Sequence, residues 1–174
     1  MSEYPFDVIA RWTRRWNTHE WHGRSPVPQS LSSAVAAIER DLGCWVSKKP
    51  LPDFSGYEWD ILVVGEFGLA HVQLRRWDES GWGGYLRTEN PLDRDLPTAQ
   101  ATAFLADELQ GDLTGNAWID WPSAGWDILH ATVVDGTAVW VRTRDPHHPL
   151  ARIGHLCTDR RTSWGPADGS PGGE

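Results

Sequence analysis

The sequence lacks the features that mark several large protein classes. Its two cysteines, Cys44 and Cys157, allow one pairing in 174 residues, which is not the disulfide framework of a small secreted domain. No apolar run approaches the roughly 20 residues of a transmembrane helix. The first ten residues also lack the basic and then apolar layout of a signal peptide. We therefore expect both thiols to be reduced, the protein to be cytoplasmic, and no membrane to be bound.

Positive charge is scarce as well. The chain has 16 Lys and Arg against 24 Asp and Glu, which gives a net charge of -8 and a pI near 5.3. Residues 51–120 alone hold thirteen acidic and four basic side chains. A nucleic-acid binder would instead show a basic stripe and a high pI. Because a field of one sign attracts partners of the other, we expect a basic protein as partner and no nucleic acid.

Motifs of the common catalytic and cofactor-binding classes are missing too. The sequence contains no GxSxG, no phosphate-binding loop and no GxGxxG, and we expect no cofactor. One alternative is a small metal or His-based site. Its candidate residues are His130, His147, His148, His155 and Cys157. Of these, His155 and Cys157 would face one side of a predicted strand, and His147 and His148 are nearby.

Three segments have the spacing of amphipathic helices. They are Pro5–Asn17, a segment from the capping residue Ser30 to the stop at Gly43, and Pro97–Leu113. Their aligned apolar positions are Val8, Ile9, Trp12 and Trp16 in the first, Leu31, Val35, Ile38 and Leu42 in the second, and Ala101, Leu105 and Leu109 in the third.

Other segments are typical of strands. The runs Tyr57–Phe67, Leu69–Trp77 and Trp82–Thr88 predict a three-stranded meander. Between Trp126 and Arg144, the Asp135-Gly136 pair separates two β-rich runs and predicts a hairpin with a type I′ turn. Leu150–Cys157 predicts one further short strand.

The order of these elements favours one α+β domain. Adjacent strands are joined by short turns rather than by helical crossovers, so we expect a mainly antiparallel sheet packed with about three helices. The predicted domain covers residues 1–160. Residues 161–174 are rich in Gly, Pro and Ser and are expected to form a flexible tail.

Four short motifs carry a resemblance to known sequences. They are Ala106–Gln110, Trp121-Pro122, Asp135–Trp140 and Ile153–Leu156. Together they resemble a pattern in uncharacterised small bacterial cytoplasmic proteins, over the stretch from residue 106 to residue 156. In those proteins Cys-Pro and His often follow the Trp-Pro pair and the hairpin Trp, whereas this chain has Ser123-Ala124-Gly125 and Arg142-Thr143-Arg144. The resemblance implies a single α+β domain and no particular activity.

Tryptophan is the compositional outlier, since twelve Trp exceed the three Tyr and four Phe combined. We expect Trp12, Trp16, Trp45 and Trp140 in the core. Those in irregular or turn segments are candidates for a contact surface, because exposed large rings dominate binding energy. They could instead cover the core from its rim, or stack on sugars or bases. The candidate partner-binding residues are Trp77, Trp82, Trp118, Asp120, Trp121 and Trp126, with the acidic residues Glu79, Asp93, Asp95, Asp107, Glu108 and Asp112.

These observations lead to a functional hypothesis. Small size, negative charge, missing catalytic motifs and surplus aromatic residues favour a non-enzymatic module that binds a basic protein. An immunity protein that blocks a toxin enzyme is its most concrete form. A small enzyme with a His/Cys or metal site is the alternative, and an assembly subunit is a third hypothesis.

Overall fold

A computed structural model describes residues 7–44, 50–65, 68–76, 84–88, 90–124 and 127–163. The helices and strands follow one another along the chain with short connections. In order they are β1 (Val8–Arg15), β2 (His22–Gly23), α1 (Gln29–Leu42), the 3₁₀ turn η1 (Phe54–Gly56), β3 (Tyr57–Val64), β4 (Leu69–Arg76), β5 (Gly84–Arg87), β6 (Leu92–Asp93), α2 (Thr98–Ala117), β7 (Ser123–Ala124), β8 (Asp127–Val134), β9 (Thr137–Arg142), β10 (Asp145–Arg152) and α3 (Leu156–Ser163).

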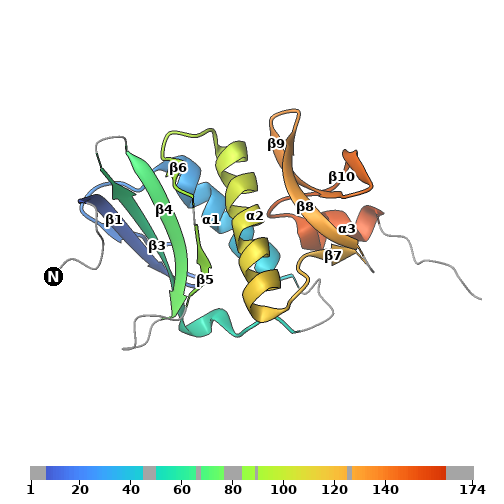
Figure 1. Cartoon of the computed structure of the whole chain (residues 1–174), viewed down its shortest axis with the longest axis horizontal. Coiled ribbons are helices and arrows are strands. Elements are labelled where there is room, and N and C mark those ends of the chain that lie inside the picture. The colour runs from blue at the N-terminus through green and yellow to red at the C-terminus, as the bar shows by residue number, and fades with distance from the viewer. Residues whose placement is uncertain are drawn as a thin grey trace, which may run out of the picture.

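Two antiparallel sheets lie on either side of a helical layer (Figure 1). The first sheet has the strand order β2-β1-β3-β4-β5, with β6 beside β4, and the second has the order β10-β9-β8-β7. Helices α1 and α2 pack against each other between the sheets, and α2 also contacts β5 and β8. The predicted α+β class, with a mainly antiparallel sheet arrangement and three helices in the described residues, is confirmed.

The predicted meander forms the centre of the first sheet. Every residue of β3 is buried, and β3 pairs along its whole length with β4. The next strand, β5, begins at Gly84, so the start of the expected run at Trp82 lies outside the described residues. Gly68 has φ of +65°, a conformation that glycine adopts without strain, in the connection from β3 to β4.

The predicted helix at Pro5–Asn17 is wrong, because Val8–Arg15 forms strand β1. Val8, Trp12 and Trp16 also fit an alternation of two, and in the strand Trp12 and Arg14 point into the protein and are 4% and 3% exposed. Pairing with the fully buried β3, from Val8 opposite Val64 to Arg15 opposite Glu58, selects the strand. Tertiary pairing therefore overrides the helical spacing of four apolar residues.

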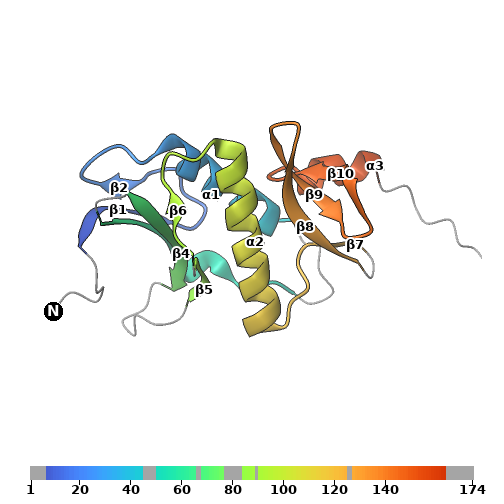
Figure 2. The same ribbon diagram turned by 45° about the horizontal axis from the view of Figure 1, so that its top comes forward.

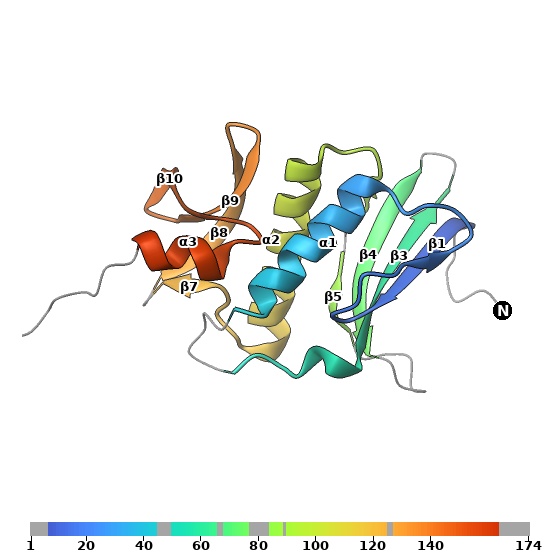
Figure 3. The ribbon, with the colours of Figure 1, turned by 180° about the vertical axis from the view of Figure 1, so that it is seen from behind.

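Helix α1 agrees closely with its prediction. Leu31, Val35, Ile38 and Leu42 are all buried, and the helix ends at Gly43. The expected cap is different, since Pro28 occupies the N-cap position and the Ser30 hydroxyl donates instead to the carbonyl of Arg94 at 3.2 Å. Figure 3 shows α1 from behind, crossing in front of α2 and running toward α3.

The second sheet contains the predicted hairpin. Asp135 and Gly136 have φ of +48° and +74°, as the type I′ turn between β8 and β9 requires. The strand expected at Leu150–Cys157 is displaced, because β10 covers Asp145–Arg152 and helix α3 begins at Leu156. This helix ends at Ser163, three residues beyond the predicted domain boundary at residue 160.

The two cysteines form a disulfide between the end of α1 and α3, so the expectation of two reduced thiols is wrong. The Cα atoms of Cys44 and Cys157 lie 5.5 Å apart, within the normal range for a disulfide. The bond joins residues 113 positions apart in the sequence. Sequence spacing gave no sign of this pairing, because packing α3 against α1 is a property of the tertiary structure.

Buried residues from both sheets and from all three helices form one hydrophobic cluster, and Trp59, Trp121 and Trp140 are its largest fully buried side chains. Within the described ranges, no helix is both long enough and apolar enough to cross a membrane.

Candidate interaction surface

Helix α2 carries the candidate surface at its C-terminal end. The helix stops at Trp118, which adopts the left-handed conformation with φ of +55° and ψ of +40°. Trp118 and Ile119 both donate their backbone N–H to the carbonyl of Leu113, which closes the helix end. This conformation costs a residue with a Cβ about 1–2 kcal/mol, whereas glycine adopts it freely. The chain therefore keeps a strained tryptophan where glycine is the usual residue.

Trp118 is also exposed. Its relative exposure is 76%, the highest among the exposed large hydrophobic residues of the described chain. By contrast, Trp12 is 4% exposed, and Trp59 and Trp140 are fully buried. A ring with this exposure contributes little to the core and leaves a large apolar area available for contact.

The neighbourhood of Trp118 is acidic. Asp120 is exposed two residues later, and Asp107 is exposed on α2. Glu108 and Asp112 are half-buried on the same helix, and the Asn116 amide donates to Asp112 at 3.3 Å. No Lys or Arg occurs between Thr98 and Asp120. This part of the chain therefore carries only negative charge.

The exposed side of α2 has glycine, which has no side chain, at two positions. Asp107, Gly111 and Gly115 are spaced by four residues and share one side of the helix, and all three are exposed. A Cβ built on either glycine would meet nothing within 4 Å. In Figures 1 and 2, no described element lies in front of α2. A partner could therefore approach the helix backbone closely beside Trp118.

Asp93 and Asp95 are not part of this surface. Both are exposed in the turn before α2, where the Asp93 carboxylate accepts the N–H of Asp95 at 2.9 Å. Arg94 Nε lies 3.7 Å from the Asp95 carboxylate. Since α2 has 20 residues, about 30 Å of helix separates this turn from Trp118.

The prediction that Trp121 belongs to the contact surface is wrong. It is fully buried, and its ring packs edge-on against Trp140 with 5.5 Å between centroids. The buried Gln110 side chain donates to the Trp121 carbonyl at 3.1 Å and also to the carbonyl of Leu129. The strand contacts that bury Trp121 come from residues distant in sequence, which is why its irregular segment suggested exposure. Trp77, Glu79, Trp82 and Trp126 lie outside the described residues.

The alternative His/Cys site has no free thiol at Cys157. Cys157 is bonded to Cys44, and His155 and Cys157 lie at the start of α3 rather than on one face of a strand. His147 and His148 are exposed on β10, and His148 Nδ1 lies 2.5 Å from the Asp145 carboxylate. No group of three or more metal-ligating side chains occurs in the part of the chain that the structure describes.

Sequence reasoning missed one buried polar centre, Asp41. Its carboxylate accepts the Trp140 indole N–H at 2.8 Å and the backbone N–H groups of Gly154 and Leu156 at 2.7 and 2.9 Å. Burial raises the pKa of Asp41, and these hydrogen bonds oppose the rise. The available signal was an Asp on the apolar stripe of α1, three residues after Ile38.

Two further buried carboxylates lie on the face of the first sheet that the helices do not cover. Glu58 and Asp60 are 3% and 0% exposed, although their alternation on β3 gave no sign of burial. Asp60 accepts two hydrogen bonds from Arg11, at 2.9 and 2.7 Å, and Arg75 pairs with Glu58. These ion pairs hold neighbouring strands together, and we assign them a structural role.

The structure thus places Trp118 and Asp120 directly after the C-terminal end of α2, whereas Asp93 and Asp95 precede the other end of the helix and Trp121 is buried. Comparison of the chain with protein-family models, with curated proteins and with solved structures finds no match.

Proposed function

We propose that this chain is a non-enzymatic protein-binding module, and that Trp118 with the acidic surface beside it binds a basic region of a partner protein. An immunity-type inhibitor of a basic toxin or enzyme is the most concrete form of this function. The observation that carries the proposal is the exposure of Trp118, at 76%, in a strained left-handed backbone conformation.

Two physical arguments support this assignment. Tryptophan is enriched among the few residues that dominate binding energy, because a ring buried in a partner pocket removes a large apolar area from water. Strained backbone conformations also persist mainly where function requires them, so a tryptophan at this position is a better candidate than a relaxed surface residue.

The charge supports a basic partner. Asp107, Glu108, Asp112 and Asp120 give the stretch from Thr98 to Asp120 four negative charges and no positive one. Such a surface speeds the encounter with a basic partner and disfavours nucleic acids and anionic membranes, which carry the same sign.

The compartment is a separate part of the proposal. A cytoplasmic location stays a prediction, and the Cys44–Cys157 disulfide opposes it, because glutathione and thioredoxin keep most cytosolic thiols reduced. The small-enzyme alternative also stays a prediction, with His130, His147, His148 and His155 as its remaining residues. Elemental analysis of the purified protein tests it directly, since that alternative expects stoichiometric metal.

The binding proposal is tested by co-purification from the native cells with the tagged full chain and two variants. In Trp118→Gly the ring is removed and the backbone strain is relieved, so we expect about 1 kcal/mol of added stability together with loss of the partner. In the matched control, Val133→Ala, an apolar residue that is 37% exposed on the distant hairpin is trimmed, and capture should persist.

The wild-type protein should retain one near-stoichiometric basic partner at low salt and release it at high salt, because screening weakens exposed charge contacts. Cross-links should map to α2 and the turn after it. The proposal fails if no partner is recovered at either salt concentration, or if Trp118→Gly, confirmed as folded by urea denaturation, retains the partner as well as Val133→Ala does.

A further inference from the structure

The outer edge of strand β1 is only partly covered. Strand β2 has two residues and pairs with Trp12 and Thr13 alone (Figure 2). Within the described ranges, no strand lies outside Val8, Ile9 and Ala10. An uncovered strand edge offers unpaired N–H and C=O groups to another extended chain.

The backbone direction at this edge follows from the neighbouring hydrogen bonds. Trp16 donates its N–H to Tyr57 at 2.9 Å, so alternate residues up to Ala10 direct their backbone groups toward β3. At the other end, Gly65 donates to the carbonyl of Asp7 at 3.0 Å. The register shift between Val8 and Ala10 inserts one extra residue in β1. Val8 and Ile9 therefore lie between Asp7 and Ala10, the two positions whose backbone groups face β3.

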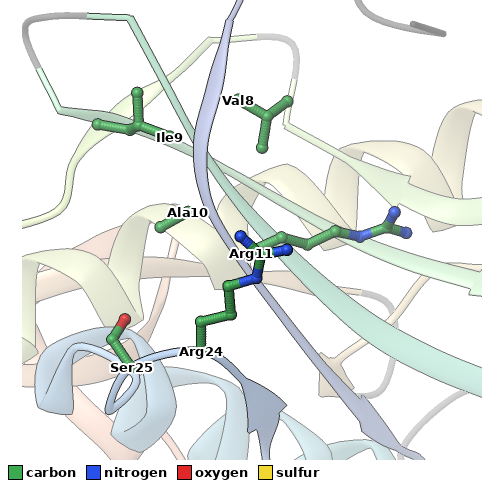
Figure 4. A pocket seen from close by; sticks show the side chains of 6 residues that line it. All are labelled: Val8, Ile9, Ala10, Arg11, Arg24 and Ser25. Carbon is green, nitrogen blue, oxygen red and sulfur yellow. The ribbon is translucent and has the colours of Figure 1, made fainter.

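A cavity of about 330 Å³ lies at this edge. It is lined by Val8, Ile9, Ala10, Arg11, Arg24 and Ser25, which Figure 4 shows as sticks. Val8 and Ile9 are 38% and 56% exposed, and they account for two of the four exposed large hydrophobic residues in the described chain. The cavity volume suits a few side chains of a short peptide rather than a large ligand.

The charge of this edge is opposite to that of the whole molecule. Arg11 is held by Asp60, whereas Arg24 is exposed and forms no ion pair with any residue that the structure describes. In Figure 4 the Arg24 side chain reaches β1 beside Arg11, whose own side chain extends in the other direction. Asp7 precedes the strand but does not line the cavity. A carboxylate entering the cavity would meet Arg24 beside an apolar surface.

We propose that the Val8–Ala10 edge of β1 is a second interaction surface, which binds a short extended acidic segment of a partner protein by strand addition. The segment pairs its backbone with β1, places an apolar side chain on Val8 and Ile9, and sets a carboxylate against Arg24. This inference is independent of the proposed function, because none of its residues belongs to the Trp118 surface.

The test uses a capped pentapeptide of alternating valine and aspartate, titrated into the isotope-labelled full chain up to about 2 mM. We expect the largest shifts of backbone amide signals at residues 8–10. The Arg24→Ala variant should bind the peptide about two- to fivefold more weakly, as for one exposed ion pair. Arg144→Ala, in which an exposed arginine is removed from the distant β9–β10 turn, is the charge-matched control and should leave binding unchanged.

Two peptide controls separate strand addition from simple charge attraction. A peptide with lysine in place of aspartate should bind at least about tenfold more weakly. A valine–aspartate peptide with N-methylated amides keeps the side chains but cannot donate ladder hydrogen bonds, and it should lose binding. Trp118→Gly should bind the valine–aspartate peptide normally. The inference is overturned if that peptide does not bind, if the N-methylated or lysine peptide binds equally well, or if the shifts lie away from this edge.

Discussion

At the level of single residues, Trp118 and Trp121 show how strongly environment decides the role of one residue type. They are three positions apart, yet one is 76% exposed and the other fully buried. The turn at the end of α2 directs the chain so that Ile119 and Trp121 enter the core while Trp118 stays outside. The sequence marks both as tryptophans in an irregular segment and does not distinguish them.

Asp41 is the residue for which pH dependence can be predicted. We expect Asp41→Asn to lower the free energy of unfolding by about 1–3 kcal/mol. The amide nitrogen replaces one carboxylate oxygen and cannot accept, so the variant loses at least one of the hydrogen bonds from Trp140, Gly154 and Leu156. Urea denaturation of the wild type and the variant measures this difference.

The pH at which the difference is measured matters. The pKa of Asp41 is raised by burial, so its contribution to stability is full below the ordinary aspartate value near 4 and is lost as the pH rises through the raised pKa. The stability advantage of the wild type over Asp41→Asn should therefore shrink with rising pH. An advantage that grows with pH would contradict this sign.

At the level of elements, two glycines make α2 less stable than the same helix with alanine at those positions would be. Gly111 and Gly115 are exposed inside the helix, where glycine costs about 0.5–1 kcal/mol relative to alanine. Gly111→Ala and Gly115→Ala should each raise the free energy of unfolding by about that amount, since an added Cβ meets nothing within 4 Å. Thermal or urea unfolding provides the measurement.

Gly154 provides the contrasting variant for this prediction. It has φ of +90°, and a Cβ there would lie 2.9 Å from the Cβ of Ala37 on α1. Gly154→Ala should therefore destabilise the protein. If all three substitutions change stability in the same direction, then glycine conformation and local space do not explain the role of these residues.

The elements also show where reading the sequence succeeds. The stripe of α1, the strand that starts at Leu69 and the Asp135-Gly136 turn depend on local spacing and on backbone preference, and their predictions are confirmed. The segment of β1 is predicted as a helix, because Val8, Ile9, Trp12 and Trp16 fit the helical period, whereas Val8, Trp12 and Trp16 also fit the strand period of two. Only pairing with β3 separates the two possibilities, and that partner lies some 50 residues further along the chain.

At the level of the whole molecule, the Cys44–Cys157 disulfide connects α1 to the C-terminal helix across 113 positions. We expect reduction, or the double change Cys44→Ser with Cys157→Ser, to lower the free energy of unfolding by about 2–4 kcal/mol, because an unfolded chain without the cross-link has more conformational freedom. Urea denaturation with and without reductant tests this, and the reduced wild type and the double variant should agree. A midpoint that does not respond to reductant would show that the protein does not depend on this bond.

The oxidation state of Cys44 and Cys157 in cells tests the predicted compartment. Alkylation of free thiols in acid-quenched cells counts how many cysteines are reduced where the protein works. Two free thiols support the predicted cytoplasmic location, whereas none indicates an oxidising environment for at least part of the life of the protein.

The sequence by itself determined the fold class, most elements, and the acidic charge, because these depend on composition and on short-range spacing. It also placed Trp118 among the candidate contact residues. Only the tertiary structure decided that Trp121 is core, that β1 is a strand with an open edge, that Asp41 binds three donors, and that Cys44 meets Cys157. Each of these depends on contacts between residues far apart in the chain, and no local pattern encodes which distant partner a residue will meet.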